Sequence, residues 1–114
     1  MDEKTPLADR SCQPCHGGVA PLAGEQLEEL LEQLNDWRVE EGHHLVRIFK
    51  FPDFAGALEH VNRVAALAEE LDHHPNIAFT WGKVEIRIWT HAIDGLSEID
   101  FVLAAKIDRC ETEN

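Results

Sequence analysis

Basic residues are scarce in this sequence. Its 114 residues include 10 lysines and arginines against 22 aspartates and glutamates, which gives a formal net charge of −12 at pH 7. A protein this acidic is repelled by the phosphates of a nucleic acid and by an anionic bilayer surface. We therefore expect neither direct nucleic-acid binding nor membrane binding.

Long apolar runs are also missing. No segment approaches the roughly 18 apolar residues of a membrane-spanning helix. The opening residues, MDEKTPLADR, are acidic, whereas a secretory signal begins with a basic and then an apolar segment. The chain has three cysteines, an odd count that argues against a fully paired disulfide framework and suits a reducing compartment. The sequence therefore predicts a cytoplasmic protein.

Apolar periodicity is absent from residues 1–23, which contain three of the five prolines and a Gly-Gly step. Such a segment predicts a flexible or loosely docked N-terminal extension. Residues 24–114 are enough for a single domain, and 44% of the whole chain is hydrophobic. We therefore expect one domain with one core.

Helical patterns occur in three parts of residues 24–114. Leucines at helical spacing predict a helix from Gly24, and Asp53 can cap a second helix that ends at His74, before a proline. A capping-box pattern from Ser97 predicts a third helix. The predicted apolar face of the second helix consists of Phe54, Ala57, Leu58, Val61, Ala65, Ala68 and Leu71.

Strand patterns fill the two intervals between these helices. β-branched and aromatic residues flank the turn-forming step Glu41-Gly42, and apolar residues alternate on both sides of Gly82. The order is therefore helix, strand, strand, helix, strand, strand, helix. Strands paired locally as hairpins, with the helices packed on one face, predict an α+β domain.

The segment CQPCH, with Cys12, Cys15 and His16, matches the pattern of c-type haem attachment and could also begin a zinc site. Haem attachment normally requires export, which the opening residues do not support. A zinc site would need a fourth ligand, and Cys110 could supply one only if the two ends of the chain met. We therefore expect no metal and no cofactor here, and a tail without ligands.

Two further groups of histidines are expected to be ordinary surface residues. His43 and His44 lie beside a hairpin turn, where neighbouring side chains point to opposite faces, so the two rings are not expected to act together. His60 is predicted on the polar side of the second helix, in contact with solvent. Neither group is assigned a function.

His73 and His74 stand at the predicted end of the second helix, and His91 follows the last strand. The carbonyls at a helix C-terminus favour protonated imidazole, although such histidines are also ordinary helix caps. Three converging imidazoles could bind zinc or could transfer protons without a metal, since the unperturbed pKa of histidine is about 6.5. Adjacent histidines rarely point at one atom, which favours acid/base chemistry.

The spacing of these residues closely resembles the signature of the pterin-4a-carbinolamine dehydratases. The resemblance covers about residues 24 to 109 and implies a four-stranded antiparallel sheet with three helices on one face. It also implies assembly as a homodimer or homotetramer. The residues that carry it are Glu69, His73, His74, Pro75, Trp81, His91 and Asp100.

The resemblance implies the loss of water from a 4a-hydroxytetrahydropterin, which gives a quinonoid dihydropterin for tetrahydrobiopterin recycling. The hydroxyl group must be protonated as it leaves, and N5 of the ring must lose a proton. The resemblance makes His73, His74 and His91 the acid/base set, of which His74 and His91 are the strongest candidates. No metal or other cofactor is implied.

The remaining residues of the signature are expected to contact the pterin or to orient the histidines. Glu69 is one helical turn before His73 and is expected to orient its ring. Asp100 is expected to orient His91 or to bind the polar edge of the pterin, unless it only caps the third helix. Pro75 and Trp81 are assigned to substrate binding.

The implied partners are a pterin substrate and, in the same pathway, an aromatic amino acid hydroxylase. Some members of the family also act as a dimerisation cofactor for a homeodomain transcription factor. A binding protein of that kind, or a protein of another pterin-related pathway, is therefore the alternative hypothesis.

Overall fold

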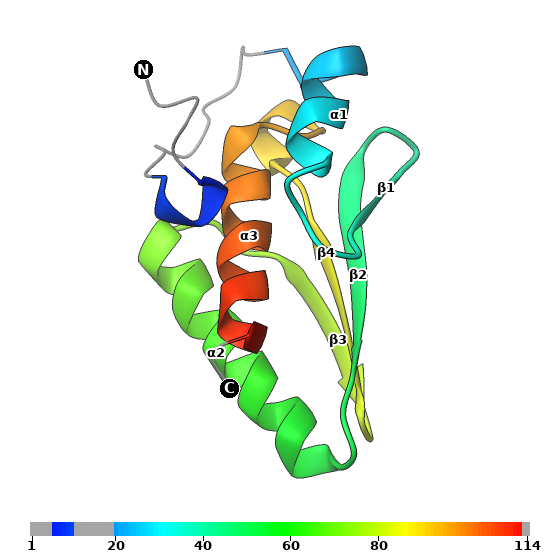
Figure 1. Cartoon of the computed structure of the whole chain (residues 1–114), viewed down its shortest axis with the longest axis vertical. Coiled ribbons are helices and arrows are strands. Elements are labelled where there is room, and N and C mark those ends of the chain that lie inside the picture. The colour runs from blue at the N-terminus through cyan, green and yellow to red at the C-terminus, as the bar shows by residue number, and fades with distance from the viewer. Residues whose placement is uncertain (1–5, 11–19, 113–114) are drawn as a thin grey trace.

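The computed structural model describes residues 6–10 and 20–112 (Figure 1). Within these residues, the helices are α1 (Gly24–Leu31), α2 (Phe54–Leu71) and α3 (Glu98–Thr112), and the short 3₁₀ helices are η1 (Leu7–Asp9) and η2 (His91–Ile93). The strands are β1 (Arg38–Glu40), β2 (His44–Lys50), β3 (Asn76–Thr80) and β4 (Lys83–Ile88). The predicted order of three helices and four strands is confirmed. No helix in the described ranges is long and apolar enough to cross a bilayer.

The four strands form one antiparallel sheet in the order β1-β2-β4-β3, and the helices pack on one of its faces (Figure 1). This arrangement confirms the predicted α+β fold. The central strands pair with Leu45 opposite Ile88, while Asn76 at the start of β3 pairs with Arg87 near the end of β4. The start of β3 therefore lies beside the end of β4.

Alternation along β4 places its apolar side chains in the core. Val84, Ile86 and Ile88 are fully buried, because alternate side chains of a strand point to the same face and this face meets the helices. α3 contributes Phe101 and Leu103, which are also fully buried. The sheet and α3 thus share one hydrophobic core.

The buried face of α2 differs from the prediction. Its buried residues are Ala57, His60, Val64 and Ala68, whereas Phe54 and Leu58 are 44% and 40% exposed. Ala57 and Ala68 belong to both the predicted and the observed face, so the buried face of the helix is shifted toward His60 and Val64. The prediction that His60 is solvated was wrong.

The imidazole of His60 belongs to the core. Its ring centroid lies 4.4 Å from that of Phe49 and 5.2 Å from that of Phe51, and the residue is 2% exposed. An imidazole presents apolar faces to aromatic neighbours. Hydropathy assigns histidine to the surface, so this packing could not be predicted from the sequence.

The predicted end of α2 at His74 was also wrong. The helix ends at Leu71, and Asp72 adopts a left-handed conformation with φ 52° that caps it. The backbone N–H of His73 donates to the carbonyl of Ala68 at 3.0 Å, which completes the cap. The two histidines therefore lie in the connection between α2 and β3 and not within the last helical turn.

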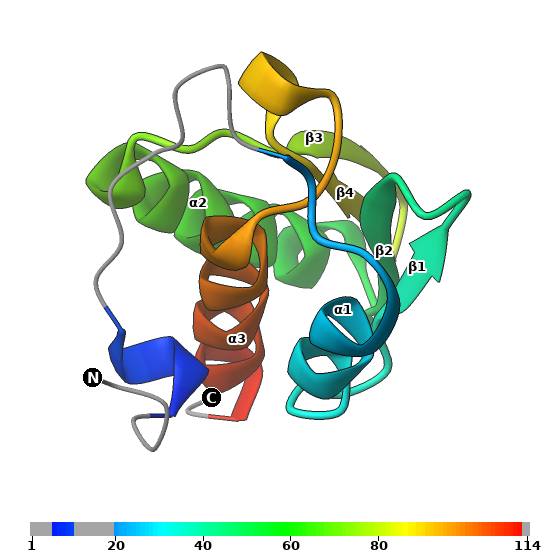
Figure 2. The ribbon, with the colours of Figure 1, turned by 90° about the horizontal axis from the view of Figure 1, so that it is seen from above.

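The described part of the predicted N-terminal extension is docked on the domain. Leu7 in η1 is 3% exposed and belongs to the core cluster, and the Lys106 ammonium donates to the Ala8 carbonyl at 2.7 Å. η1 lies beside α3 in both views (Figures 1 and 2). Residues 6–10 are therefore held by apolar burial and by α3, whereas the CQPCH segment lies outside the described residues.

Candidate active site

The carboxylate of Asp100 connects the loop that carries His73 and His74 to Thr90, which follows β4. Its Oδ1 accepts from Nε2 of His73 at 2.5 Å, and its Oδ2 accepts from Oγ1 of Thr90 at 2.8 Å. The backbone N–H of Ser97 donates to the same Oδ2 at 2.8 Å. Asp100 is fully buried, so this one side chain fixes two separate segments of the chain.

The contacts of Asp100 correct its predicted role. It binds His73 and not His91, and with no exposed surface it cannot contact the polar edge of a ligand directly. Its bond to the Ser97 backbone N–H is the return bond of a capping box, as expected for the start of α3. Asp100 therefore caps α3 and positions a histidine at the same time.

His74 has a different partner and a different environment. Its Nε2 lies 2.6 Å from a carboxylate oxygen of Glu69, and its side chain is 54% exposed. A carboxylate can only accept, so Nε2 donates to it and Nδ1 faces away from this pair. The prediction that Glu69 orients His73 was wrong, because its carboxylate holds His74 instead.

His91 begins η2, directly after Thr90, and its side chain is exposed. Its ring is stacked on that of Trp89, with a centroid distance of 4.5 Å and an interplanar angle of 5°. The loop after it is closed by two backbone bonds between Thr90 and Gly95. The position of His91 is thus fixed by its neighbours in sequence.

The structure places His73, His74 and His91 at one end of the molecule. Asn76 pairs with Arg87, so the chain just before β3 lies beside the chain just after β4. The end of α2, the start of β3, η2 and the start of α3 meet at the same end (Figure 1). Pro75 lies between this cluster and β3 and is half-buried.

Trp81 is not near these histidines in the same chain. It follows β3 at the turn into β4 and is 67% exposed. The five residues of β3 separate this turn from the histidine end by about 17 Å, at a rise of about 3.3 Å per residue. Within one chain, the structure does not place Trp81 in the same site.

The expectation that His43 and His44 are independent surface residues was wrong. Both are half-buried, and their Nδ1 atoms lie 3.1 Å apart. His43 precedes β2 and belongs to the turn, where the alternation of strand side chains does not apply. Their rings also contact Trp89, with centroid distances of 5.4 and 5.8 Å.

The sequence did not reveal the roles of Thr90 and Trp89. Thr90 is 3% exposed and supplies the hydroxyl that ties β4 to Asp100. Its position directly before His91 was the only available signal. In the described ranges, no group of three histidine, cysteine or acidic side chains is arranged to hold a metal ion.

Comparison with known proteins identifies the family of this chain. The family model described as pterin 4 alpha carbinolamine dehydratase matches residues 20–110. A protein of Rubrobacter xylanophilus, named "Putative pterin-4-alpha-carbinolamine dehydratase", is 58% identical over 103 residues, which are 90% of this chain and 96% of the relative. A protein of Alkaliphilus metalliredigens with the same name is 46% identical over 108 residues, which are 94% and 97% of the two chains.

Solved structures show the same fold. The crystal structure of a transcriptional coactivator/pterin dehydratase from Brucella melitensis superposes with a TM-score of 0.74 at 32% identity, over 78% of this chain and 96% of that one. A pterin dehydratase-like protein described as a RuBisCO assembly factor gives a TM-score of 0.57 at 28% identity, over 66% and 88% of the two chains. From the family match and these relatives, the chain belongs to the pterin-4-alpha-carbinolamine dehydratase family.

Proposed function

We propose that this protein dehydrates a 4a-hydroxytetrahydropterin to a quinonoid dihydropterin by histidine acid/base catalysis. The observation that carries the proposal is the buried Asp100 carboxylate, which binds His73 and the residue before His91. This contact holds the two histidine segments of the family signature at one end of the domain. Family membership supports the same reaction.

The chemistry requires two proton transfers, one at the C4a hydroxyl group and one at the neighbouring N5. The C4a hydroxyl group takes a proton and leaves as water, while N5 gives up a proton and the C=N bond forms. A positioned histidine contributes about 10² to 10⁴ to the rate of such a transfer. Neither a hydride acceptor nor a covalent nucleophile is required.

His74 and His91 are proposed as the groups that touch the pterin, because both side chains are exposed at this end of the domain. The Glu69 carboxylate holds the His74 ring through Nε2, which leaves Nδ1 directed away from the pair. His73 is 8% exposed and donates to Asp100. We propose that it forms the inner wall of the site, with its remaining nitrogen available to the substrate.

The proposed physiological setting is the recycling of tetrahydrobiopterin after an aromatic amino acid hydroxylase has used it. In that setting the hydroxylase releases the 4a-hydroxypterin, and this protein prevents its accumulation. The family name of the relatives supports the pterin class of substrate. No metal takes part in the proposed reaction.

The test follows the absorbance of 4a-hydroxytetrahydrobiopterin, generated by a hydroxylase, in the presence and absence of the purified protein. We expect decay of the intermediate to accelerate in proportion to protein concentration, with the same rate after treatment with a chelator. Decay at the spontaneous rate would contradict the dehydratase proposal and would favour the alternative of a binding protein. Loss of activity on chelation, with recovery on adding zinc, would contradict the metal-free mechanism.

A further inference from the structure

A cluster of aromatic and charged side chains lies behind His91, on the face of the sheet opposite the helices. Trp89 follows β4 and is half-buried, and its indole stacks against the His91 ring at 4.5 Å with a 5° interplanar angle. A parallel stack restricts rotation of the smaller ring about its side-chain bonds. His91 is exposed, so this stack is the contact that defines its orientation.

The rings of His43 and His44 pack against Trp89. The rings of His43 and His44 lie 5.4 and 5.8 Å from the Trp89 ring, tilted by 45° and 55°. These residues belong to the β1–β2 turn and the start of β2, which are far from His91 in the sequence. The turn therefore packs against the indole that carries His91.

The turn is also tied to the loop after His91 by a polar contact. Nε2 of His43 lies 2.8 Å from a carboxylate oxygen of Asp94, the residue that caps η2 in a left-handed conformation with φ 50°. This contact links the β1–β2 turn to the C-terminal end of η2. Both ends of the short His91–Ile93 helix are thus held, one by the indole and one by His43.

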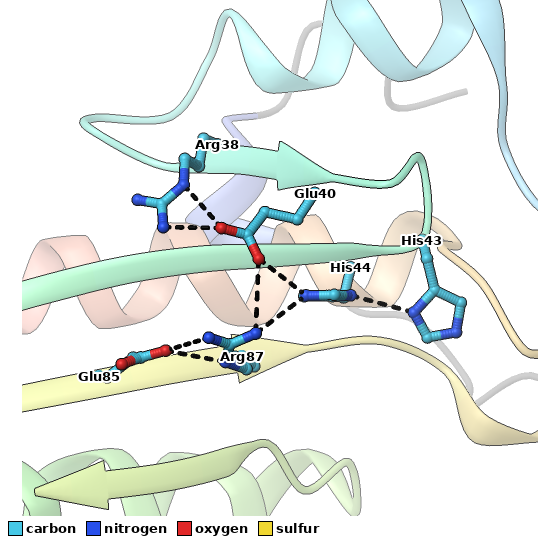
Figure 3. Close-up of polar contacts among 6 residues, drawn as sticks. All are labelled: Arg38, Glu40, His43, His44, Glu85 and Arg87. Carbon is cyan, nitrogen blue, oxygen red and sulfur yellow. Dashed lines mark hydrogen bonds and ion pairs between the residues drawn. The ribbon is translucent and has the colours of Figure 1, made fainter.

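Polar contacts connect the two imidazoles of this cluster to Asp94 at one end and to Arg87 and Glu40 at the other. The Asp94 carboxylate can only accept, so Nε2 of His43 donates to it. The Nδ1 atoms of the two rings lie 3.1 Å apart, and Nε2 of His44 lies 3.3 Å from Nη1 of Arg87 and 3.4 Å from Oε1 of Glu40 (Figure 3). One continuous network of polar contacts thus runs from Arg87 and Glu40 to Asp94.

Arg87 is held in turn by two acidic residues on the same face. Its guanidinium donates to Glu85, with Nε 2.8 Å from Oε2, and its Nη1 lies 3.4 Å from Oε1 of Glu40 (Figure 3). Glu40 is also bound by Arg38. The pKa of the Glu40 carboxyl is lowered, and the hydrogen bond from Arg38 is the largest cause. Arg87 is therefore a cation held between two carboxylates at one end of the network.

We propose that Trp89, His43, His44 and Asp94 are positioning residues that hold the His91 ring for catalysis. This inference rests on the proposed function, in which His91 touches the pterin. The cluster acts through an aromatic stack and through the His43–Asp94 contact, neither of which reaches the substrate. Its effect is to place an exposed ring without burying it.

The test replaces Trp89 by leucine and by phenylalanine. Leucine removes the aromatic plane, whereas phenylalanine keeps it. In Trp89→Leu we expect the ring-proton NMR resonances of His91 to lose their ring-current shift and kcat to fall roughly 10- to 100-fold, since a misplacement of about 1 Å can cost 10². Trp89→Phe is expected to restore most of both values.

Two further variants separate positioning from general damage. Trp81→Leu makes the same replacement at the far end of the β3–β4 hairpin and is expected to leave the His91 resonances in place. Asp94→Ala is expected to shift them, whereas Asp94→Asn keeps an acceptor oxygen for His43 and should have a smaller effect.

Asp94→Ala keeps the indole, so a change in the ring-current shift of His91 in that variant reports movement of the His91 ring. Unchanged His91 resonances in Asp94→Ala would overturn the inference, whatever the activity. Unchanged kcat in Trp89→Leu would also overturn it, because the stack would then have no consequence for the reaction. If the wild-type protein proved inactive, the proposed function would fail, while the resonances would still decide whether the cluster holds His91.

Discussion

Replacing Asp108 by alanine is expected to lower the free energy of unfolding by about 3–5 kcal/mol, because a buried arginine would lose the buried carboxylate that it contacts. Nη1 of Arg47 lies 2.5 Å from Oδ1 of Asp108, and the two side chains are 8% and 7% exposed. The indole N–H of Trp37 donates to the same oxygen at 2.8 Å, and the backbone N–H of Asn35 donates to Oδ2 at 3.2 Å. The variant thus removes the carboxylate that these three donors share.

The balance of forces at Asp108 explains why the loss is large. Burial raises the pKa of its carboxyl group, while the bonds from Trp37, Asn35 and Arg47 act in the opposite direction. The pair is therefore costly to bury and adds little over an apolar pair, but breaking it exposes the full cost of a buried charge. Asp108 also links α3 to β2, which makes the effect global.

Urea denaturation followed by circular dichroism measures this loss, and Asp36→Asn is the control. Asp36 has a left-handed backbone with φ 63°, which asparagine tolerates, so this variant removes the charge without straining the backbone. Asp36 also approaches Arg47, at 3.7 Å, but its side chain is 83% exposed. An exposed ion pair contributes about 0–1 kcal/mol, so the control is expected to stay close to the wild type. Equal losses in the two variants would contradict the assignment of the buried pair.

Replacing Asp100 by alanine is expected to reduce both stability and activity. His73 Nε2, Thr90 Oγ1 and the Ser97 backbone N–H would lose their shared acceptor. Each unsatisfied buried donor costs about 1–3 kcal/mol, so we expect a loss of at least about 3 kcal/mol. The rate of pterin dehydration is expected to fall about 10²-fold, because His73 would no longer be held in one orientation.

The control for Asp100 is Ser97→Ala. The Ser97 hydroxyl contacts Oγ1 of Thr90 at 2.8 Å, so its loss removes one hydrogen bond, worth about 1 kcal/mol, and leaves the carboxylate in place. Its activity is expected to fall far less than that of the Asp100 variant. Activities are compared at a temperature where circular dichroism shows each variant folded, and Asp100→Asn, which keeps the side-chain shape, replaces the alanine variant if that one does not fold. Equal activity in the Asp100 and Ser97 variants would contradict a positioning role.

The sequence predicted the architecture of the domain well because strong local signals agreed with one another. Alternation in β4 marked the buried residues Val84, Ile86 and Ile88, and the Ser97 capping pattern marked the start of α3. The buried face of α2 was not predictable from hydropathy, because His60, a residue that hydropathy assigns to the surface, occupies a core position. A left-handed cap at Asp72 ends α2 before His74, and this position has no glycine, the residue that usually indicates such a cap.

Spacing selected the histidines of the candidate site but did not identify the side chains that they contact. Glu69 and Asp100 were both singled out, yet the structure pairs them with His74 and His73 and not with the rings first assigned. The His73–Asp100 contact depends on how the α2–β3 connection meets α3 in space, whereas the Glu69–His74 contact lies within the segment that ends α2. His43 and Asp94 are 51 positions apart, and sequence patterns do not predict contacts between residues so far apart.

The most direct test of the account is a stopped-flow measurement of 4a-hydroxytetrahydrobiopterin decay with wild-type protein, His74→Ala and His91→Ala. Both rings are exposed, so both variants are expected to fold normally. We expect each replacement to lower the rate constant by about 10² to 10⁴, the contribution of a positioned acid or base. Decay as fast as that of the wild type in both variants would contradict the assignment of these histidines as the catalytic groups.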